Sequence, residues 1–251
     1  MFLVFTGLLA GGAGATDLAM ERRWQEAVID QVVVGNVHWL DADGYRFYSI
    51  YTEADSSPKG AVIIMHGMRR HPDWPDVIAP LRTALAKQGW ATLSLQMPVL
   101  GFDTGMRDHS VLLNESPARI WAAIGFLKKR DHKKIVLIGH GLGAIMGASY
   151  LVENGKKDIA GLAAIGMYML NYTDPRMWTP DLLVKLRLPI LDIYGQMDQY
   201  GVEHDKEVRA QAAARANNRR YRQVMISQAD HDFTGHGDEL VDHIKRWLEE
   251  L

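Results

Sequence analysis

The chain has 251 residues, of which 47% are hydrophobic and 23% are charged, with a formal net charge of −2 and no cysteine. Such a chain can bury one large core, and no shift in composition divides it, so we predict a single domain. The balanced charge gives no electrostatic reason to expect nucleic acid or an anionic membrane as a partner. The absence of cysteine excludes disulfides, thiolate catalysis and zinc–thiolate sites.

The N-terminal stretch is similar to the end of a secretory signal peptide. Residues 1–9 are almost wholly apolar, and Ala13-Gly14-Ala15 then offers a small-residue cleavage site before Thr16. The positively charged start of a signal peptide is missing, and a buried N-terminal strand is the alternative interpretation. No other stretch approaches the roughly 18 apolar residues that a membrane span needs. We therefore expect residues 1–15 to be a signal peptide and the mature protein to be soluble, and periplasmic or secreted.

Apolar strands alternate with amphipathic helices along most of the chain. The first elements are a helix over residues 17–31 and two strands, residues 32–40 and 45–51, joined by a polar hairpin turn that ends at Gly44. Strands without polar residues that alternate with helices indicate a parallel sheet covered on both faces. We therefore predict an α/β fold with a mostly parallel central sheet and an N-terminal antiparallel hairpin. Further strands are predicted at 61–65, 91–95, 134–138, 159–165, 189–194 and 221–226, and further helices at 76–88, 116–129, 142–153, 203–216 and 238–251.

The strand predicted at 134–138 runs directly into a glycine-rich turn, Gly139-His140-Gly141-Leu142-Gly143, and a helix follows. Strand, tight turn and helix form the context of a nucleophile elbow, in which G-x-S-x-G holds the nucleophile in a strained conformation. Gly141 takes the place of the nucleophile, and glycine adopts that conformation without strain but offers no attacking atom. A phosphate-binding glycine loop is the alternative, but its usual position after the first strand and its acidic partner about 20 residues on are not clearly present.

Three further strand ends carry residues that suit a hydrolase site. His66-Gly67-Met68 follows the strand at 61–65, where the backbone N–H groups of an oxyanion hole belong. Asp198 comes shortly after the strand at 189–194, and His231 follows the last strand. The order elbow, acid, histidine is that of the α/β-hydrolase triad, in which a carboxylate on a neighbouring loop orients the histidine. Each residue alone is more simply a surface loop residue, but their coincidence at matching strand ends indicates a site.

These motifs together resemble a bacterial α/β-hydrolase-fold protein, and more narrowly the chain is similar to a family of secreted proteobacterial proteins of unknown function with glycine at the elbow. The resemblance implies an α/β-hydrolase-like domain over residues 16–251 that lacks the serine nucleophile. It also implies that Asp198 and His231 are the acid and base, and that the N–H groups of Met68 and Leu142 form an oxyanion hole. The resemblance covers roughly residues 63–231 and is carried by His66-Gly67, His71-Pro72-Asp73-Trp74-Pro75, Pro80-Leu81-Arg82, the string from Gly89 to Pro98, and the turn from Gly139 to Ala144.

The missing nucleophile leaves two functions open. The first, which we favour slightly, is an unconventional or inactive hydrolase that binds a small apolar or ester-like ligand in a pocket of methionines and aromatic rings. The second is an active hydrolase of ester bonds in which His231, oriented by Asp198, activates a water molecule in the space of the missing side chain. Ordinary core packing of the same methionines is the alternative to such a pocket. The residues predicted to line the site are His66, Gly67, Met97, His140, Tyr168 and Trp178.

Other catalytic groups are weaker candidates. Ser94 or Ser110 would have to approach the elbow from neighbouring segments, and Ser94 lies within a predicted strand, where it is expected to pack. His66, His140 and His231 could converge on a metal ion, but the sequence has no H-x-x-x-H or H-E-x-x-H spacing. We therefore predict no metal and no cofactor. The substrate, any protein partner and the oligomeric state lie beyond the sequence.

Overall fold

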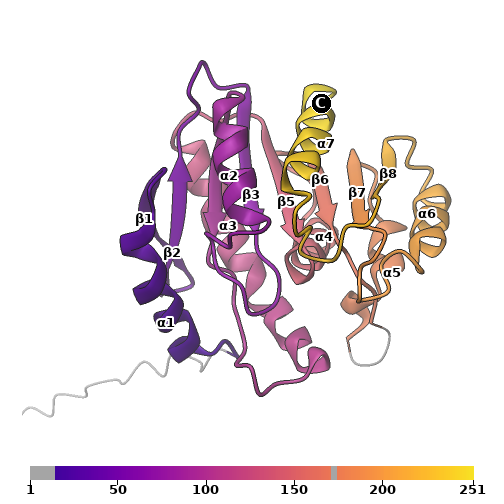
Figure 1. Cartoon of the computed structure of the whole chain (residues 1–251), viewed down its shortest axis with the longest axis horizontal. Coiled ribbons are helices and arrows are strands. Elements are labelled where there is room, and N and C mark those ends of the chain that lie inside the picture. Colours follow the sequence, from indigo (N-terminus) through magenta and orange to yellow (C-terminus); the bar gives the residue numbers. More distant parts are fainter. Residues whose placement is uncertain (1–14, 171–173) are drawn as a thin grey trace, which may run out of the picture.

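A computed structural model of the chain describes residues 15–170 and 174–251 (Figure 1). Within these residues eight strands form one sheet: β1 (Asn36–Ala42), β2 (Tyr45–Thr52), β3 (Gly60–Met65), β4 (Trp90–Leu95), β5 (Ile135–His140), β6 (Ile159–Ile165), β7 (Ile190–Gly195) and β8 (Tyr221–Ile226). Their order across the sheet is β1-β2-β4-β3-β5-β6-β7-β8. β2 is antiparallel to both of its neighbours, and all other pairs are parallel. The predicted fold class is confirmed.

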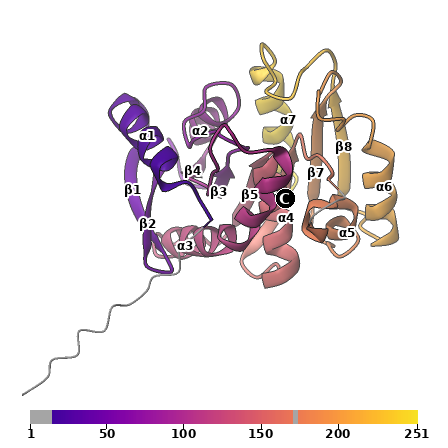
Figure 2. The same ribbon diagram turned by 90° about the horizontal axis from the view of Figure 1, so that it is seen from below.

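Helices cover both faces of the sheet. They are α1 (Leu18–Val28), α2 (Ile78–Lys87), α3 (Ser116–Lys128), α4 (Leu142–Asn154), α5 (Thr179–Leu183), α6 (Lys206–Arg215) and α7 (Gly237–Glu249), with short 3₁₀ helices η1 (Ile29–Gln31), η2 (Met106–Asn114) and η3 (Pro175–Met177). Figures 1 and 2 show α2 and α7 on one face and α3 and α4 on the other. This layering buries the parallel strands in the middle of the sheet between helices, whereas the edge strand β8 stays partly exposed, and it follows from the apolar strands of the sequence.

The middle strands are buried on both faces, and β3 shows how. Val62 and Ile64 point to the face that α2 and α7 cover, whereas Ala61, Ile63 and Met65 belong to the core on the opposite face. Successive side chains of a strand point to opposite faces, so a strand covered on both sides has no position for a polar residue. This double burial is the physical reason for the uninterrupted apolar runs of the sequence.

The connections differ more from the prediction than the strands do. The irregular segment that begins at Met97 ends in η2, and the segment between β6 and β7 contains η3 and α5. The helix predicted from residue 203 begins at Lys206, because residues 201–205 form turns. In the sheet, β4 lies between β2 and β3, an order that the local patterns do not indicate.

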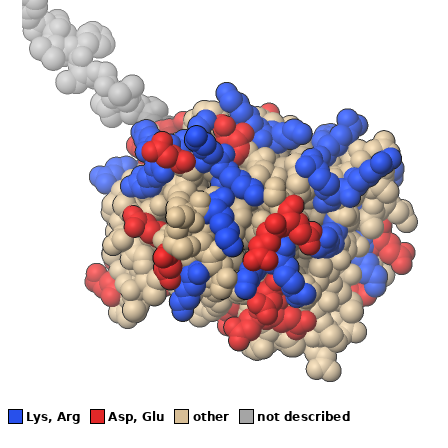
Figure 3. Space-filling model, turned by 90° about the horizontal axis from the view of Figure 1, so that it is seen from above, with Lys and Arg blue, Asp and Glu red and all other residues tan. Residues whose placement is uncertain are grey.

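The two edges of the sheet at the strand ends have different characters. All parallel strands end at one edge, and the loops with the predicted site residues follow them there. Figure 3 looks onto the opposite edge, where these strands begin. Lys and Arg side chains are widely spread there, and Asp and Glu side chains lie in several places among them. No helix of the described residues has the length and apolar character to cross a membrane. Residues 1–14 of the predicted signal peptide lie outside the described residues.

Candidate active site

The turn between β5 and α4 has the geometry of a nucleophile elbow with glycine at its apex. Gly141 lies at φ 52° and ψ −116°, a conformation that side chains disfavour and glycine tolerates. Its N–H donates to the carbonyl oxygen of Ile165 in β6 at 2.8 Å, which fixes the turn on the sheet. Gly143 packs so closely on β3 that a Cβ there would overlap the carbonyl oxygen of Met65. Strand and helix therefore approach each other as a tight elbow requires.

Asp198 and His231 lie on neighbouring loops beyond β7 and β8. Nδ1–H of His231 donates to Oδ2 of Asp198 at 2.7 Å, and both side chains are buried. Oδ1 of Asp198 accepts the backbone N–H of Tyr200 at 2.9 Å, so both carboxylate oxygens are engaged. The two loops are also joined by the N–H of Met197, which donates to the carbonyl of Ala229 at 2.9 Å. Because Nδ1 carries the proton, Nε2 is the acceptor of the neutral imidazole.

Nε2 of His231, which has no hydrogen-bond partner among the described residues, faces the apex of the elbow. A Cβ atom on Gly141 would lie 3.0 Å from Nε2 of His231 and 3.6 Å from the ring of Tyr168. Tyr200 packs edge-on against the imidazole with 4.5 Å between ring centroids, and the ring of His140 lies 4.6 Å away. The structure thus brings together the positions predicted for nucleophile, acid and base.

A small cavity lies between the elbow and the turn that follows β3. About 20 Å³ of it is open to the centre of a water molecule, which is room for about one water. Ligand pockets are typically about 300–1,000 Å³, so the cavity that the described residues form here is much smaller than the adaptable apolar pocket expected from the sequence. Met97 and Met167 are instead buried in the core. The cavity is lined by Gly67, Met68, Arg70, His140, Leu142, Tyr168, Tyr200 and His231.

Two buried side-chain groups at this cavity have no hydrogen-bond partner among the described residues. Nε2–H of His140 donates to the backbone carbonyl of His231 at 2.9 Å, which leaves Nδ1 of His140 as a free acceptor. Burial lowers the pKa of His140 well below its ordinary value, so the ring is neutral. The hydroxyl of Tyr168 is also unpaired, and burial raises its pKa, so it keeps its proton. Unpaired buried polar groups beside a cavity are suited to bind a water molecule.

The two residues whose backbone N–H groups were predicted to form an oxyanion hole line the same cavity. Leu142 is the first residue of α4, where a backbone N–H has no acceptor within the helix. Met68 lies in the turn after β3, and no acceptor among the described residues receives its N–H. Both residues line the cavity. Two free backbone donors beside an imidazole are the groups with which hydrolases stabilise a developing oxyanion.

Three of the predicted lining residues do not reach the cavity. Nδ1–H of His66 donates to the carbonyl of Gly67 at 2.8 Å, and its Nε2 accepts the backbone N–H of Met97 at 2.9 Å. Burial lowers the pKa of His66 to about 3, so this neutral ring holds the turn after β3 together and offers nothing to a ligand. Met97 is buried in the core, and Trp178 lies between η3 and α5 and does not line the cavity.

Two residues that line the cavity were not indicated by the sequence. Arg70 forms an ion pair with Asp232 at 2.7 Å and stacks on Trp74, with its guanidinium carbon 4.1 Å from the ring centroid. Its partner is 162 positions away, so no local pattern could have shown the pair. Tyr200 had a possible signal, because an Asp commonly accepts the backbone N–H of the residue two positions on.

The described residues contain no group of three or more His, Asp or Glu side chains placed to hold a metal ion. Both ring nitrogens of His66 are bonded to the protein, as are Nε2 of His140 and Nδ1 of His231. Ser94 is buried in β4 and Ser110 in η2, and neither lines the cavity. The serines considered as alternative nucleophiles are therefore not part of this cavity.

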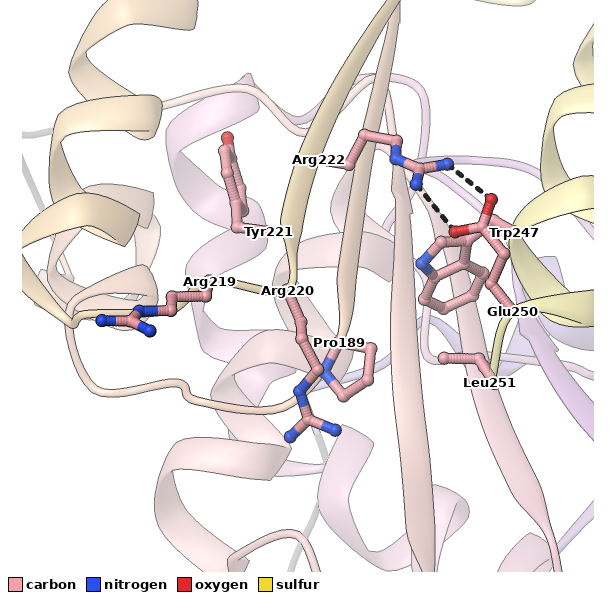
Figure 4. Close-up of a pocket in the computed structure, with 8 residues that line it drawn as sticks. All are labelled: Pro189, Arg219, Arg220, Tyr221, Arg222, Trp247, Glu250 and Leu251. Atoms are coloured by element: carbon pink, nitrogen blue, oxygen red, sulfur yellow. Dashed lines mark hydrogen bonds and ion pairs between the residues drawn. The ribbon is translucent and has the colours of Figure 1, made fainter.

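A larger hollow of about 240 Å³ lies at the opposite edge of the sheet, where β7 and β8 begin (Figure 4). Arg222 donates to both carboxylate oxygens of Glu250 at 3.0 and 2.7 Å, while Arg219 and Arg220 point away from this pair. Its lining residues have no buried side-chain atom without a partner. The hollow has room but no reactive pair, and it is not part of the candidate site.

The fold is similar to those of solved esterases and a dienelactone hydrolase. Est1E from Butyrivibrio proteoclasticus is 18% identical, with a TM-score of 0.67 over 86% of this chain and 98% of that chain. The esterase Pf2001 from Pyrococcus furiosus is 15% identical, with a TM-score of 0.68 over 86% of this chain and 92% of that chain. The dienelactone hydrolase from Anabaena variabilis is 16% identical, with a TM-score of 0.67 over 86% of this chain and 97% of that chain. At such identities the likeness shows the fold alone.

No curated protein matches the sequence. The family described as "Protein of unknown function (DUF3530)" matches residues 18–110 and 103–250. These ranges include the elbow at Gly141, Asp198 and His231. The chain has an α/β-hydrolase fold and belongs to this family of unknown function.

Proposed function

We propose that the protein is a hydrolase of ester bonds in which His231, oriented by Asp198, activates a water molecule above Gly141. One observation carries the proposal. Nε2 of His231 lies 3.0 Å from the point that a Cβ of residue 141 would occupy, while Nδ1 is bonded to Asp198. A general base has to lie within hydrogen-bonding reach of the group that it deprotonates. Since glycine has no side chain, the group to be deprotonated in this proposal is a water molecule in the cavity beside Gly141.

The partners around the cavity suit one water molecule. A buried water typically makes about three hydrogen bonds to otherwise unpaired polar groups. In the proposed arrangement Nε2 of His231 and Nδ1 of His140 accept its two hydrogens and the hydroxyl of Tyr168 donates to its oxygen. The groups on His140 and Tyr168 are buried and have no partner among the described residues. With both hydrogens directed at imidazoles, one lone pair of the water stays available for attack on a carbonyl carbon.

The proposed reaction needs no covalent intermediate. His231 takes a proton from the water as the water oxygen bonds to the ester carbonyl carbon, and Asp198 stabilises the resulting imidazolium. The carbonyl oxygen becomes an oxyanion that accepts hydrogen bonds from the N–H groups of Met68 and Leu142. His231 then returns the proton to the leaving alkoxide as the carbon–oxygen bond breaks. General acid–base catalysis contributes about 10²–10⁴-fold, so we expect slow turnover.

Ligand binding without turnover is the competing function, and the lack of an attacking side chain favours it. The sequence alone favoured this alternative slightly. The cavity changes the balance, because it has room for about one water and its unpaired groups, on His140 and Tyr168, are polar. A small apolar ligand would leave those groups without partners, which is energetically unfavourable.

Turnover of short-chain p-nitrophenyl esters by the natural protein, His231→Ala and His243→Ala tests the proposed base. His243 is half-buried on α7, does not line the cavity and serves as the matched control. We expect His231→Ala to lower kcat/KM by about 10²–10⁴-fold and His243→Ala to leave it unchanged. Rapid mixing should show no burst of p-nitrophenol, because no acyl-enzyme accumulates. Equal turnover by His231→Ala, or no turnover of the ester series by the natural protein, would count against the proposal.

Gly141→Ala tests the water itself. Its added Cβ would stand 3.0 Å from Nε2 of His231 and crowd the space assigned to the water, so we expect most turnover to be lost. The positive φ of this position adds strain of about 1–3 kcal/mol, and circular dichroism has to show that the variant is folded. Gly141→Ser would add a hydroxyl at the same place. A burst of product from that variant would show that Asp198 and His231 can also activate a side chain.

A further inference from the structure

The first described residues occupy a fitted site on the body of the protein. The hydroxyl of Thr16 donates to Oε1 of Glu21 at 2.5 Å and accepts the backbone N–H of Val99 at 2.9 Å, and only 8% of Thr16 is exposed. The N–H of Asp17 donates to the carbonyl of Val99 at 2.7 Å. Side chain and backbone of this segment are therefore held both by nearby Glu21 and by Val99, which is distant in the sequence, and this is unusual for a segment close to a chain terminus.

A carboxylate faces the backbone nitrogen of Thr16. Glu115, which precedes α3, accepts the N–H of Thr16 at 3.1 Å with Oε1, and the N–H of Ala15 donates to the same oxygen. No Lys, Arg or His side chain of the described residues is paired with Glu115. Two neutral amides thus meet a half-buried carboxylate whose charge has no cationic partner in the part of the chain that the structure describes. Such a carboxylate would bind a cation at residue 16 more strongly than an amide.

The sequence supplies a way to place a cation there. Ala13-Gly14-Ala15 has the small-residue pattern that secretory leader peptidases recognise, with Thr16 as the next residue. Hydrolysis of the bond between Ala15 and Thr16 leaves a carboxylate on Ala15 and an α-ammonium on Thr16. We propose that a leader peptidase cuts the chain at this bond, and that the new α-ammonium of Thr16 docks on Glu115 as an ion pair. The site is thus a receptor for the mature N-terminus.

A series of contacts connects the docked terminus with the candidate active site. The effect on that site which we infer from it rests on the proposed function. Val99 accepts the N–H of Asp17. A few residues further along the chain, the carbonyls of Gly101 and Thr104 accept hydrogen bonds from the guanidinium of Arg69. Arg69 has a φ of 56°, an unfavourable conformation for a residue with a side chain, so it depends on such contacts. It directly follows Met68, whose N–H is proposed to hold the oxyanion. Docking of the terminus would therefore help to fix this turn.

The first test concerns the cut. The full chain is expressed from Met1 in a Gram-negative bacterium, and the protein from the periplasmic fraction is identified by intact mass and N-terminal sequencing. We expect a chain that begins at Thr16. A protein that keeps residues 1–15, or that begins at another residue, would overturn the proposal.

The second test measures the ion pair without relying on activity. A chain that begins at Thr16 is compared with the same chain after α-amino acetylation, which keeps the N–H group and removes the charge. Each form is studied with Glu115 and with Glu115→Gln, and Glu53→Gln, an exposed loop residue, serves as the control. We expect Glu115→Gln to lower the Tm of the free-amino form by about 2–4 °C, the shift that about 1 kcal/mol gives in a chain of this size, and to affect the acetylated form less.

Raising the pH gives an independent check. An α-amino group ordinarily loses its proton near pH 8, so the difference between the free and acetylated forms should be present at neutral pH and disappear at about pH 10. An equal effect of Glu115→Gln on both forms would mean that Glu115 only accepts amide hydrogen bonds, and it would overturn the ion pair. Because these readouts are stability and mass, a failure of ester hydrolysis would leave this proposal standing.

Discussion

Two buried carboxylates belong to β7 and to the loop that follows it, and they have different hydrogen-bond partners. Asp192 lies inside the strand and is fully buried. Its Oδ2 accepts hydrogen bonds from Nε of Arg209 at 2.8 Å, the hydroxyl of Tyr221 at 2.6 Å and Nε2 of Gln223 at 2.9 Å. A guanidinium keeps its charge at any ordinary pH and has no acceptor. This cluster therefore joins α6, β7 and β8 but cannot move a proton.

Asp198, on the loop just beyond the same strand, holds an imidazole instead. Its partner His231 has a second nitrogen that faces a cavity above Gly141. Burial and an ion-pair-like contact are common to both carboxylates, so neither feature marks a functional site. The difference is an open proton acceptor beside a space large enough for water, and this is the feature that the following predictions test.

The largest effect is expected from Asp198→Asn. An amide at this position can donate to Nδ1 of His231, which would place the ring proton on Nε2 and remove the acceptor above Gly141. We expect kcat/KM for p-nitrophenyl esters to fall by about 10²–10⁴-fold, with only a small change in the urea concentration at the unfolding midpoint. An active Asp198→Asn variant would show that the orientation of the imidazole is not needed.

The same substitution at the other carboxylate, Asp192→Asn, should act on stability. It leaves the buried guanidinium of Arg209 without a counter-charge, which typically costs about 3–5 kcal/mol. Urea unfolding should therefore show a much lower midpoint than for the natural protein, while the folded fraction keeps its kcat. If Asp192→Asn abolished turnover in a protein of unchanged stability, the division between a structural and a reactive carboxylate would be wrong.

Much of the fold follows from the sequence because burial on both faces removes polar residues from a strand. β3 and β5 could be predicted as parallel strands from their apolar runs alone. The position of β4 between β2 and β3 could not, since strand order depends on how connections cross the sheet, and no residue of β4 encodes its neighbours. The bounds of α6 were also missed by a few residues, because turns precede Lys206.

The residues of the site that directly follow strands could be predicted. Features that depend on contacts between distant parts of the chain could not. Gly141, Asp198 and His231 meet because the ends of parallel strands share one edge. His66 also follows a strand, but the backbone of Met97 takes its second nitrogen, and no local pattern shows that contact. The size of the cavity was likewise hidden, since it depends on how Tyr168 and other residues distant in the sequence pack around the imidazole.

His66 and His231 extend the comparison from carboxylates to imidazoles. In His66 both ring nitrogens are bonded to protein atoms, whereas in His231 only Nδ1 is. A buried ring whose two nitrogens already form hydrogen bonds to the protein cannot take up a second proton without losing one of these bonds. Burial is the main cause that lowers the pKa of His66 to about 3, whereas the same ring in an unfolded chain titrates at about 6.5.

The smallest predicted effect is on the acid sensitivity of the fold. Between pH 6.5 and pH 3 the unfolded chain binds a proton at His66 that the folded protein does not. The free energy of unfolding therefore decreases as the pH falls, by about 1.4 kcal/mol per pH unit for this group. His66→Gln, which keeps a donor and an acceptor, removes this contribution, although His71, with a pKa lowered to about 4, keeps its own. Urea unfolding at about pH 7 and pH 5 should show a loss of stability smaller by about 2 kcal/mol in the variant. An equal loss in both proteins would mean that the folded protein accommodates a charged His66. The distinction between His66, with both ring nitrogens bonded, and His231, with one free nitrogen, would then fail.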